Sequence, residues 1–230
     1  MEKIRIALQK GEPTKYVGHL DFGRAVERAL RRAKLPVAYS IGFNPHMKLS
    51  FGPALGVGIA SESEYIDVEM TEQVDIAAFS RALSDKLPPG LALVEARQVY
   101  SQASLAADLN LARYQARVIG LIGPQQIETA QTAVRRLQQA ESATYVRRSP
   151  KGVKTMELKN FLVGELQTEA AVDAFCVKYW LRMTANGAVK PQEVMRALVE
   201  QFGFPAGDTA YCRVELLAET DAGRKSAFEI

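Results

Sequence analysis

The hydrophobic pattern of the first hundred residues predicts strands and helices in the order β-α-β-β-α-β. Four segments alternate apolar and polar residues, which is the period of a half-buried strand: 4–8, 49–59, 66–70 and 91–99. Residues 19–34 and 76–87 instead carry apolar side chains at spacings of three and four, as amphipathic helices do. We expect a turn at Ser61–Glu64, between the second and third strands. This order is typical of a ferredoxin-like fold, in which two helices cover one face of an antiparallel sheet.

The same order of patterns returns in the second half of the chain. Strands are expected at 114–118, 144–148, 175–183 and 211–218, and helices begin at Gly123-Pro124 and at Pro191. An insertion at roughly 150–172 interrupts the second copy of the pattern. We therefore predict an α+β protein with two tandem ferredoxin-like domains and antiparallel sheets. The predicted parts are a domain over 1–100, a linker over 101–110, a domain over 111–221 with a basic hairpin insertion, and a tail over 222–230.

The segment Tyr39–Phe51 follows the first helix and has the composition of a shaped binding loop. Gly42 permits positive φ, and Pro45 both fixes its own φ and holds the preceding residue extended. Such restraints favour a loop that presents side chains in fixed positions. We expect one concave, cationic surface to be lined by His19, Arg24, Tyr39, Asn44, His46 and Lys48.

The amino-acid composition is that of a globular protein. Apolar residues make up 47% and charged residues 24% of the 230 positions, which are values of a globular protein. No apolar run approaches the roughly 20 residues of a membrane-spanning helix, so we expect no membrane association and a cytoplasmic protein. Cys176 and Cys212 are too few and too far apart for a zinc or iron–sulfur site built by this chain alone. We expect no metal in this chain.

Positive charge is concentrated at the start of the chain. Residues 1–50 hold ten basic and four acidic residues, a net charge of +6, and the remainder is −3. Four arginines share one side of the first predicted helix: Arg24, Arg28, Arg31 and Arg32. Guanidinium groups match phosphate geometry, so this face indicates phosphate or RNA-backbone binding. The alternative is a solvated helix surface on which Glu27 pairs with Arg31.

The two histidines, His19 and His46, are the candidate catalytic residues. Either imidazole could act as a general acid or base in RNA cleavage. The alternative is structural: His19 as a helix-start residue and His46 as a residue that stabilises its loop. Their spacing matches no metal-ligand pattern.

Two further basic sites lie in the second half. If Val177 and Tyr179 face the core, strand alternation turns the neighbouring side chains outward: Lys178, Trp180 and Arg182. Arg113, Gln115 and Arg117 would share that face, and an aromatic ring among cations is a typical platform for single-stranded RNA. The alternative is that Trp180 is covered by the first domain or by another subunit. A basic hairpin offers phosphate contacts through Arg147, Arg148, Lys151 and Lys154, without any P-loop pattern.

The first 70 residues contain a dense and ordered set of recognisable motifs. These are Gly18-His-Leu-Asp21, Arg24, Glu27–Ala33, Leu35-Pro36, Tyr39-Ser40, Gly42-Phe-Asn-Pro-His46, Ser50-Phe51, Ser61-Glu62 and Glu64-Tyr65. In these residues the chain closely resembles the radical-SAM-linked family known as domain of unknown function 2344. Members of that family are encoded beside, or fused to, a radical-SAM protein with a cobalamin-type domain. The resemblance therefore implies a radical-SAM partner that carries the iron–sulfur cluster and SAM. Met47 stands where the family usually has proline.

These observations lead to one favoured function and two alternatives. We expect a non-catalytic accessory subunit that presents substrate to a radical-SAM enzyme and binds structured RNA, either tRNA or rRNA, rather than DNA. One alternative is a metal-independent endoribonuclease that uses His19 or His46. The other is a protein-interaction module that contacts only its enzyme partner.

Overall fold

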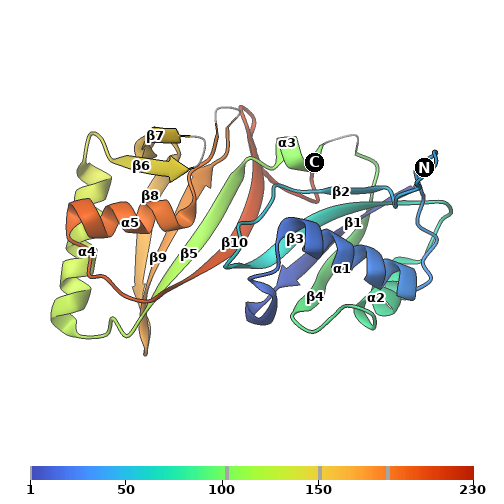
Figure 1. Cartoon of the computed structure of the whole chain (residues 1–230), viewed down its shortest axis with the longest axis horizontal. Helices are drawn as coiled ribbons and strands as arrows, with labels where there is room; N and C mark the ends of the chain where they lie inside the picture. The colour runs from blue at the N-terminus through green and yellow to red at the C-terminus, as the bar shows by residue number, and fades with distance from the viewer. Residues whose placement is uncertain (1, 102–103, 150–151, 185–186) are drawn as a thin grey trace. The chain divides into compact units, whose positions relative to one another are not determined.

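A computed structural model describes residues 2–101, 104–149, 152–184 and 187–230, and it shows a mixed α+β protein built on mostly antiparallel strands. The chain forms two compact units (Figure 1). The first unit comprises Met1–Asn110 together with Glu215–Ile230, and the second comprises Leu111–Val214. The predicted second domain ended at residue 221, whereas residues 215–230 group with the first unit.

The first unit follows the order of elements that its hydrophobic pattern predicts. Its main elements are β1 (Glu2–Lys10), α1 (His19–Arg32), β2 (Leu49–Phe51), β3 (Ile59–Met70), α2 (Ile76–Ser84) and β4 (Leu91–Val99). The strands lie in the order β4-β1-β3-β2, and each neighbouring pair is antiparallel. The unit also contains the short elements η1 (Glu12–Thr14), α3 (Leu105–Asp108) and β11 (Gly223–Ser226).

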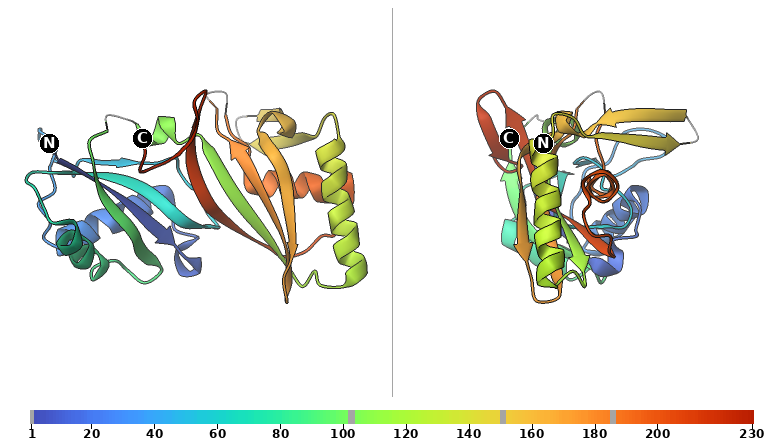
Figure 2. Two further views of the ribbon diagram at one scale, coloured as in Figure 1. Left: turned by 180° about the vertical axis from the view of Figure 1, so that it is seen from behind. Right: turned by 90° about the vertical axis from the view of Figure 1, so that its left-hand side faces the viewer.

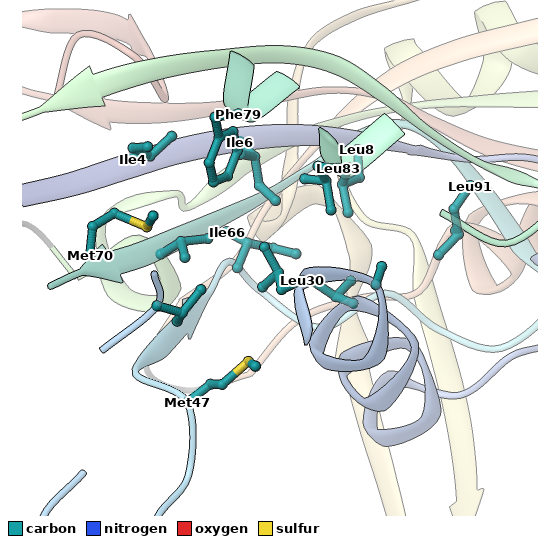
Figure 3. Packing of buried hydrophobic residues seen from close by; sticks show 14 of the residues in the cluster. Ile4, Ile6, Leu8, Leu30, Met47, Ile66, Met70, Phe79, Leu83 and Leu91 are labelled. Atoms are coloured by element: carbon teal, nitrogen blue, oxygen red, sulfur yellow. The ribbon is translucent and has the colours of Figure 1, made fainter. Parts of the chain in front are cut away.

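The core of the first unit lies between its helices and one face of its strands. Figure 3 shows Ile4, Ile6 and Leu8 of β1 in a cluster with residues of both helices. The helix residues of this cluster recur at the spacings read from the sequence: Phe22, Val26, Ala29, Leu30, Phe79 and Leu83. Met47 joins the same cluster and is 8% exposed, so it anchors the loop that precedes β2.

The predicted turn at Ser61–Glu64 is wrong, because this segment lies inside the long strand β3. The chain instead turns over residues 52–58, where Gly58 adopts a φ of +84°. The strand predicted over 49–59 is therefore wrong beyond Phe51, because β2 ends there and Ile59 already begins β3. Ser61 and Glu64 are buried opposite Lys10 and Leu8 of β1. Backbone pairing with β1 therefore overrides the weak strand propensity of a Ser-Glu segment.

The opposite face of the first unit's strands holds a buried ion pair that contacts the C-terminal tail. The Arg5 guanidinium donates hydrogen bonds of 2.6 and 3.0 Å to the two carboxylate oxygens of Asp67. Its remaining terminal nitrogen donates to the main-chain oxygens of Ala227 and, at 3.1 Å, Ile230. Both Arg5 and Asp67 are essentially inaccessible to solvent. The tail is thereby held against the face of the sheet that the helices leave uncovered.

Phe228 covers the same face. Its ring stands edge-on to Tyr65 with 5.5 Å between centroids, and the Arg97 guanidinium lies 4.7 Å from its centroid. Residues 222–230, expected as a separate tail, thus make specific contacts with β1, β3 and β4 of the first unit.

The second unit contains the strands and helices of the repeated pattern, with one inserted hairpin. Its elements are β5 (Leu111–Ile119), α4 (Pro124–Gln139), β6 (Thr144–Ser149), β7 (Gly152–Glu157), η2 (Leu158–Asn160), β8 (Leu162–Ala170), β9 (Ala174–Arg182), α5 (Pro191–Phe202) and the first part of β10 (Thr209–Thr220). The strand order is β10-β5-β9-β8. Helices α4 and α5 contact each other, and they contact β8 and β5 respectively.

The segment 144–148 is a strand, but it does not join the main sheet of the second unit as expected. It forms β6, which pairs with β7 in a two-stranded hairpin, and Figure 2 shows this hairpin extending away from the sheet. The sheet position is taken by β8, inside the segment expected to be an insertion. Five of the nine residues in β8 are exposed and are polar or small, so the local sequence lacks the clear alternation that marks a strand.

No helix in the described part of the chain is both long enough and apolar enough to span a membrane.

Candidate nucleic-acid interface

Strand alternation in the second unit separates a helix-covered face from an outer face. Tyr179 points toward α5, because its hydroxyl donates a 2.9 Å hydrogen bond to the Pro191 carbonyl. On β5, Tyr114, Ala116 and Val118 are buried in the same way. The intervening residues define the outer face: Arg113, Gln115 and Arg117 on β5, and Cys176, Lys178, Trp180 and Arg182 on β9.

The register of the β5–β9 pair sets Arg113 directly opposite Trp180. The Arg113 guanidinium carbon lies 5.7 Å from the centroid of the indole ring, within cation–π range. Arg113 also donates a 2.6 Å hydrogen bond to the side-chain oxygen of Gln167 on β8. Because this amide is neutral, it does not balance the positive charge of Arg113. A cation is therefore held beside a partly exposed aromatic ring on this face.

Two other cations of the outer face have acidic partners. Lys178 lies 2.7 Å from Glu169, and Arg117 lies 2.5 Å from Asp173. The hydrogen bond from Lys178 lowers the pKa of the Glu169 carboxyl below its ordinary value. Because these pairs are partly exposed to solvent, each contributes little to folding and can exchange a carboxylate for another anion. Among the described residues, this face thus includes a guanidinium bonded to a neutral amide and two weakly neutralised cations.

Among the basic residues of the hairpin, Arg147 forms hydrogen bonds within the protein. It makes two 2.7 Å hydrogen bonds to the carboxylate of Glu193 and a third to the Ala188 carbonyl. The Glu193 hydrogen bonds raise the pKa of Arg147, with burial acting in the opposite direction. Arg147 therefore ties the hairpin to the start of α5. Arg148 and Lys154 are exposed on the hairpin, and Lys151 lies outside the described residues.

The four arginines of α1 are all exposed, but their partners differ. Arg24 lies 3.1 Å from Asp21, and Arg32 donates to the Lys86 carbonyl. Arg28 and Arg31 form no ion pair with any residue that the structure describes, so the expected pair between Glu27 and Arg31 is not seen there. The helix thus offers two cations to a ligand.

The contacts of the two histidines lie at different points of the first unit. The exposed His19 ring stands edge-on to Phe51 with 5.6 Å between ring centroids, at the start of α1. His46 is exposed in the loop, where its backbone N–H donates to the Ser40 hydroxyl at 3.0 Å. This loop hydrogen-bonds to Glu69 near the end of β3, through Ala38 and Lys48. Within the described ranges, no group of three His, Cys, Asp or Glu side chains is placed to hold a metal ion.

Sequence reasoning missed two fully exposed apolar side chains of the loop. Ile41 and Phe43 have relative exposures of 103% and 107%, on either side of Gly42. Tyr39 is 43% exposed, Asn44 is exposed, and Lys48 lies 3.2 Å from Glu69. The signal was present in the sequence as two apolar residues flanking a glycine between two predicted elements, with no periodic partner.

Comparison with known proteins identifies a family. The model of a family described as an uncharacterized protein conserved in bacteria, DUF2344, matches residues 3–200. No curated protein matches the chain. The family description names neither an activity nor a partner.

Proposed function

The chain belongs to the DUF2344 family of uncharacterized bacterial proteins, and we propose that it is an RNA-binding accessory subunit of a partner enzyme. The observation that supports RNA binding is the Trp180–Arg113 pair on the outer face of the second unit's sheet. In this proposal the chain itself performs no chemistry. It holds a single-stranded part of a tRNA or rRNA and presents it to the enzyme.

The chemistry of the outer face suits an unpaired base better than a duplex. A base can stack on the exposed part of the indole of Trp180, while Arg113 contacts the adjoining phosphate. Lys178 and Arg117 can exchange Glu169 and Asp173 for further phosphates. A flat sheet face that displays an aromatic ring is a common way to recognise single-stranded RNA.

The architecture supports the same proposal. We propose that both units are ferredoxin-like, because each pairs two helices with four strands in the order fourth, first, third, second. In the first unit the outer face is occupied by Arg5, Asp67 and the tail residue Phe228. The corresponding face of the second unit carries Trp180 and cations instead.

The identity of the enzyme is proposed from the residues that resemble the radical-SAM-linked family, among them Gly42-Phe-Asn-Pro-His46. Iron–sulfur and SAM chemistry would belong to that partner. No contact of His19 or His46 described above favours the alternative of an endoribonuclease.

Fluorescence anisotropy with a labelled 12-nucleotide oligouridine tests the proposal at about 50 mM salt. We expect Trp180→Ala to weaken binding about 5- to 150-fold, because stacking on an aromatic side chain contributes about 1–3 kcal/mol per base. Trp180→Phe should keep most of the affinity, and Arg113→Gln should weaken binding and reduce its salt dependence.

Arg135→Gln is the matched control, because it removes one exposed positive charge from α4 on the helical side of the sheet. It should leave RNA affinity within about twofold, since long-range effects of exposed charges are largely screened. RNA that fails to bind at about 50 mM salt, or binding that is equal in the wild type and Trp180→Ala, would overturn the proposal.

A further inference from the structure

The loop between α1 and β2 places two large apolar side chains fully in solvent. Ile41 and Phe43 have relative exposures of 103% and 107%, so neither side chain is covered by the described residues of the first unit. Gly42 lies between them with a φ of +145°, a conformation that other residues rarely adopt. The loop tip is therefore an apolar projection whose shape depends on a glycine.

The base of this loop is fixed. The Ser40 N–H donates to the His46 carbonyl at 2.8 Å, and the Ser40 hydroxyl accepts from the His46 N–H at 3.0 Å. Lys48 donates its N–H to the Ala38 carbonyl at 2.8 Å. Figure 3 shows Met47 inside the core cluster. Two strand-like hydrogen bonds and one buried side chain thus fix the base of the loop that carries Ile41 and Phe43. Because the loop is already ordered, it loses less conformational entropy when a partner binds.

Two exposed cations lie in the segment that leads into the loop, while Lys48 at the base of the loop is paired with Glu69. Lys34 and Arg31 are exposed in the segment that ends α1, and the Lys34 N–H donates to the Arg31 carbonyl at 3.1 Å. Only residues 35–37 separate this segment from Ala38, and the segment 39–48 contains no acidic residue. A surface that complements this one has an apolar pocket for the tip and acidic side chains around it.

We propose that Ile41 and Phe43 are the anchor residues of a protein–protein interface, and that they insert into an apolar pocket with an acidic rim on a different protein. Isolated apolar side chains at a surface are common, but two of them on either side of one glycine in a braced loop have the character of interface anchors. The proposal does not depend on RNA binding, because it concerns another unit and other residues. Binding at Ile41 and Phe43 and stacking on Trp180 can therefore succeed or fail separately.

Site-specific photo-crosslinking in the native cell tests this interface. The photoreactive residue p-benzoylphenylalanine replaces Phe43 in one variant and Val172, which is 98% exposed in the second unit, in a control variant. We expect a cross-link from position 43 to a peptide of another protein that contains apolar residues beside Asp or Glu. The control position should give no such product.

The cross-linked protein is then purified, and its affinity is measured with wild-type and substituted chains. The double variant Ile41→Ser, Phe43→Ser should bind at least about tenfold more weakly, because anchor residues account for most of an interface's affinity. Its melting temperature should shift by less than about 2 °C, since both side chains are solvated. Arg31→Gln with Lys34→Gln should slow association several-fold while changing dissociation little. Val172→Ser should change neither rate.

Several outcomes would overturn this inference. One is that position 43 cross-links only to a second copy of the chain, to RNA or to lipid. Another is that the yield of cross-linked protein at position 43 is no greater than the yield at position 172. An unchanged affinity in the double variant would overturn it as well. Wild-type RNA affinity in the double variant would show that the two surfaces act independently.

Discussion

Replacing Asp67 with Asn should strongly destabilise the first unit, because it leaves a buried guanidinium without its counter-charge. Arg5 is 0% exposed and Asp67 is 1% exposed, so solvent cannot replace the missing carboxylate. Asn has nearly the same volume as Asp, so the substitution opens no cavity. The change therefore isolates the electrostatic contribution of the pair.

The magnitude follows from the contacts of the pair. Asp67 accepts two hydrogen bonds from Arg5, at 2.6 and 3.0 Å, and its carboxylate also lies 3.6 Å from Lys3. Removing one partner of a buried ion pair costs about 3–5 kcal/mol. That is a large part of the roughly 5–15 kcal/mol that stabilises a typical domain. The main-chain oxygens of Ala227 and Ile230 still accept from Arg5 and offset only part of the loss.

Urea unfolding followed by circular dichroism would measure this loss as a lower midpoint at an unchanged slope. The double variant Arg5→Met, Asp67→Leu provides the comparison, because it removes both charges and fills the space with apolar side chains. It should be more stable than Asp67→Asn by at least about 2 kcal/mol, since no unpaired charge stays buried.

Limited trypsin digestion would report on the tail in the same variants. Arg224 and Lys225 are exposed and immediately precede the residues that Arg5 holds. Cleavage there should be faster in Asp67→Asn than in the wild type, because the tail opens more often. A loss of less than about 1 kcal/mol in Asp67→Asn would refute the reasoning, as would a double variant that is the less stable of the two.

Two further predictions concern the second unit. Tyr179→Phe removes the 2.9 Å hydrogen bond to the Pro191 carbonyl and should lower the unfolding free energy by about 1 kcal/mol. Burial holds the pKa of the Tyr179 phenol well above its ordinary value, so its stabilisation is complete below about pH 10 and is lost as pH rises further. Denaturant titrations from about pH 8 to 11 should show a smaller alkaline loss in Tyr179→Phe, and equal losses would contradict this. Glu193→Gln weakens both the pair with Arg147 and the 2.8 Å hydrogen bond from the Lys190 N–H, and should cost about 1–3 kcal/mol by thermal unfolding. Unchanged protease resistance of the β6–β7 hairpin in that variant would show that Arg147 is not its anchor.

The sequence alone was sufficient where a local period decides the structure. The strand predicted at 91–99 is β4, and the helix predicted from His19 is α1. The alternation around Tyr179 also predicted which way Trp180 points. In each case the local alternation of apolar and polar residues is enough to predict which side chains face the core. The reason is that side-chain direction repeats every two residues in a strand and every 3.6 residues in a helix.

The tertiary structure decided which of several similar residues within one segment are buried and which are exposed. Ile41, Phe43 and Met47 are all large and apolar, yet the first two are fully exposed and the third is 8% exposed. No local period distinguishes them, because the segment is not a helix or a strand. The hydrogen bonds of Ser40 and the contact of Met47 with the core set the direction of each side chain.

The tertiary structure also decided which polar groups meet. Arg5 is bonded to Asp67 and to Ile230, residues 62 and 225 positions away along the chain. Arg147 is bonded to Glu193, 46 positions away, and so is not available as the free hairpin cation that its sequence neighbourhood indicated. An arginine in the sequence specifies a charge and five donors, but its partners are set only when pairing strands and packing helices bring distant segments together. For that reason the sequence determined the faces of the elements, and the folded chain determined which of those faces are left to bind a ligand.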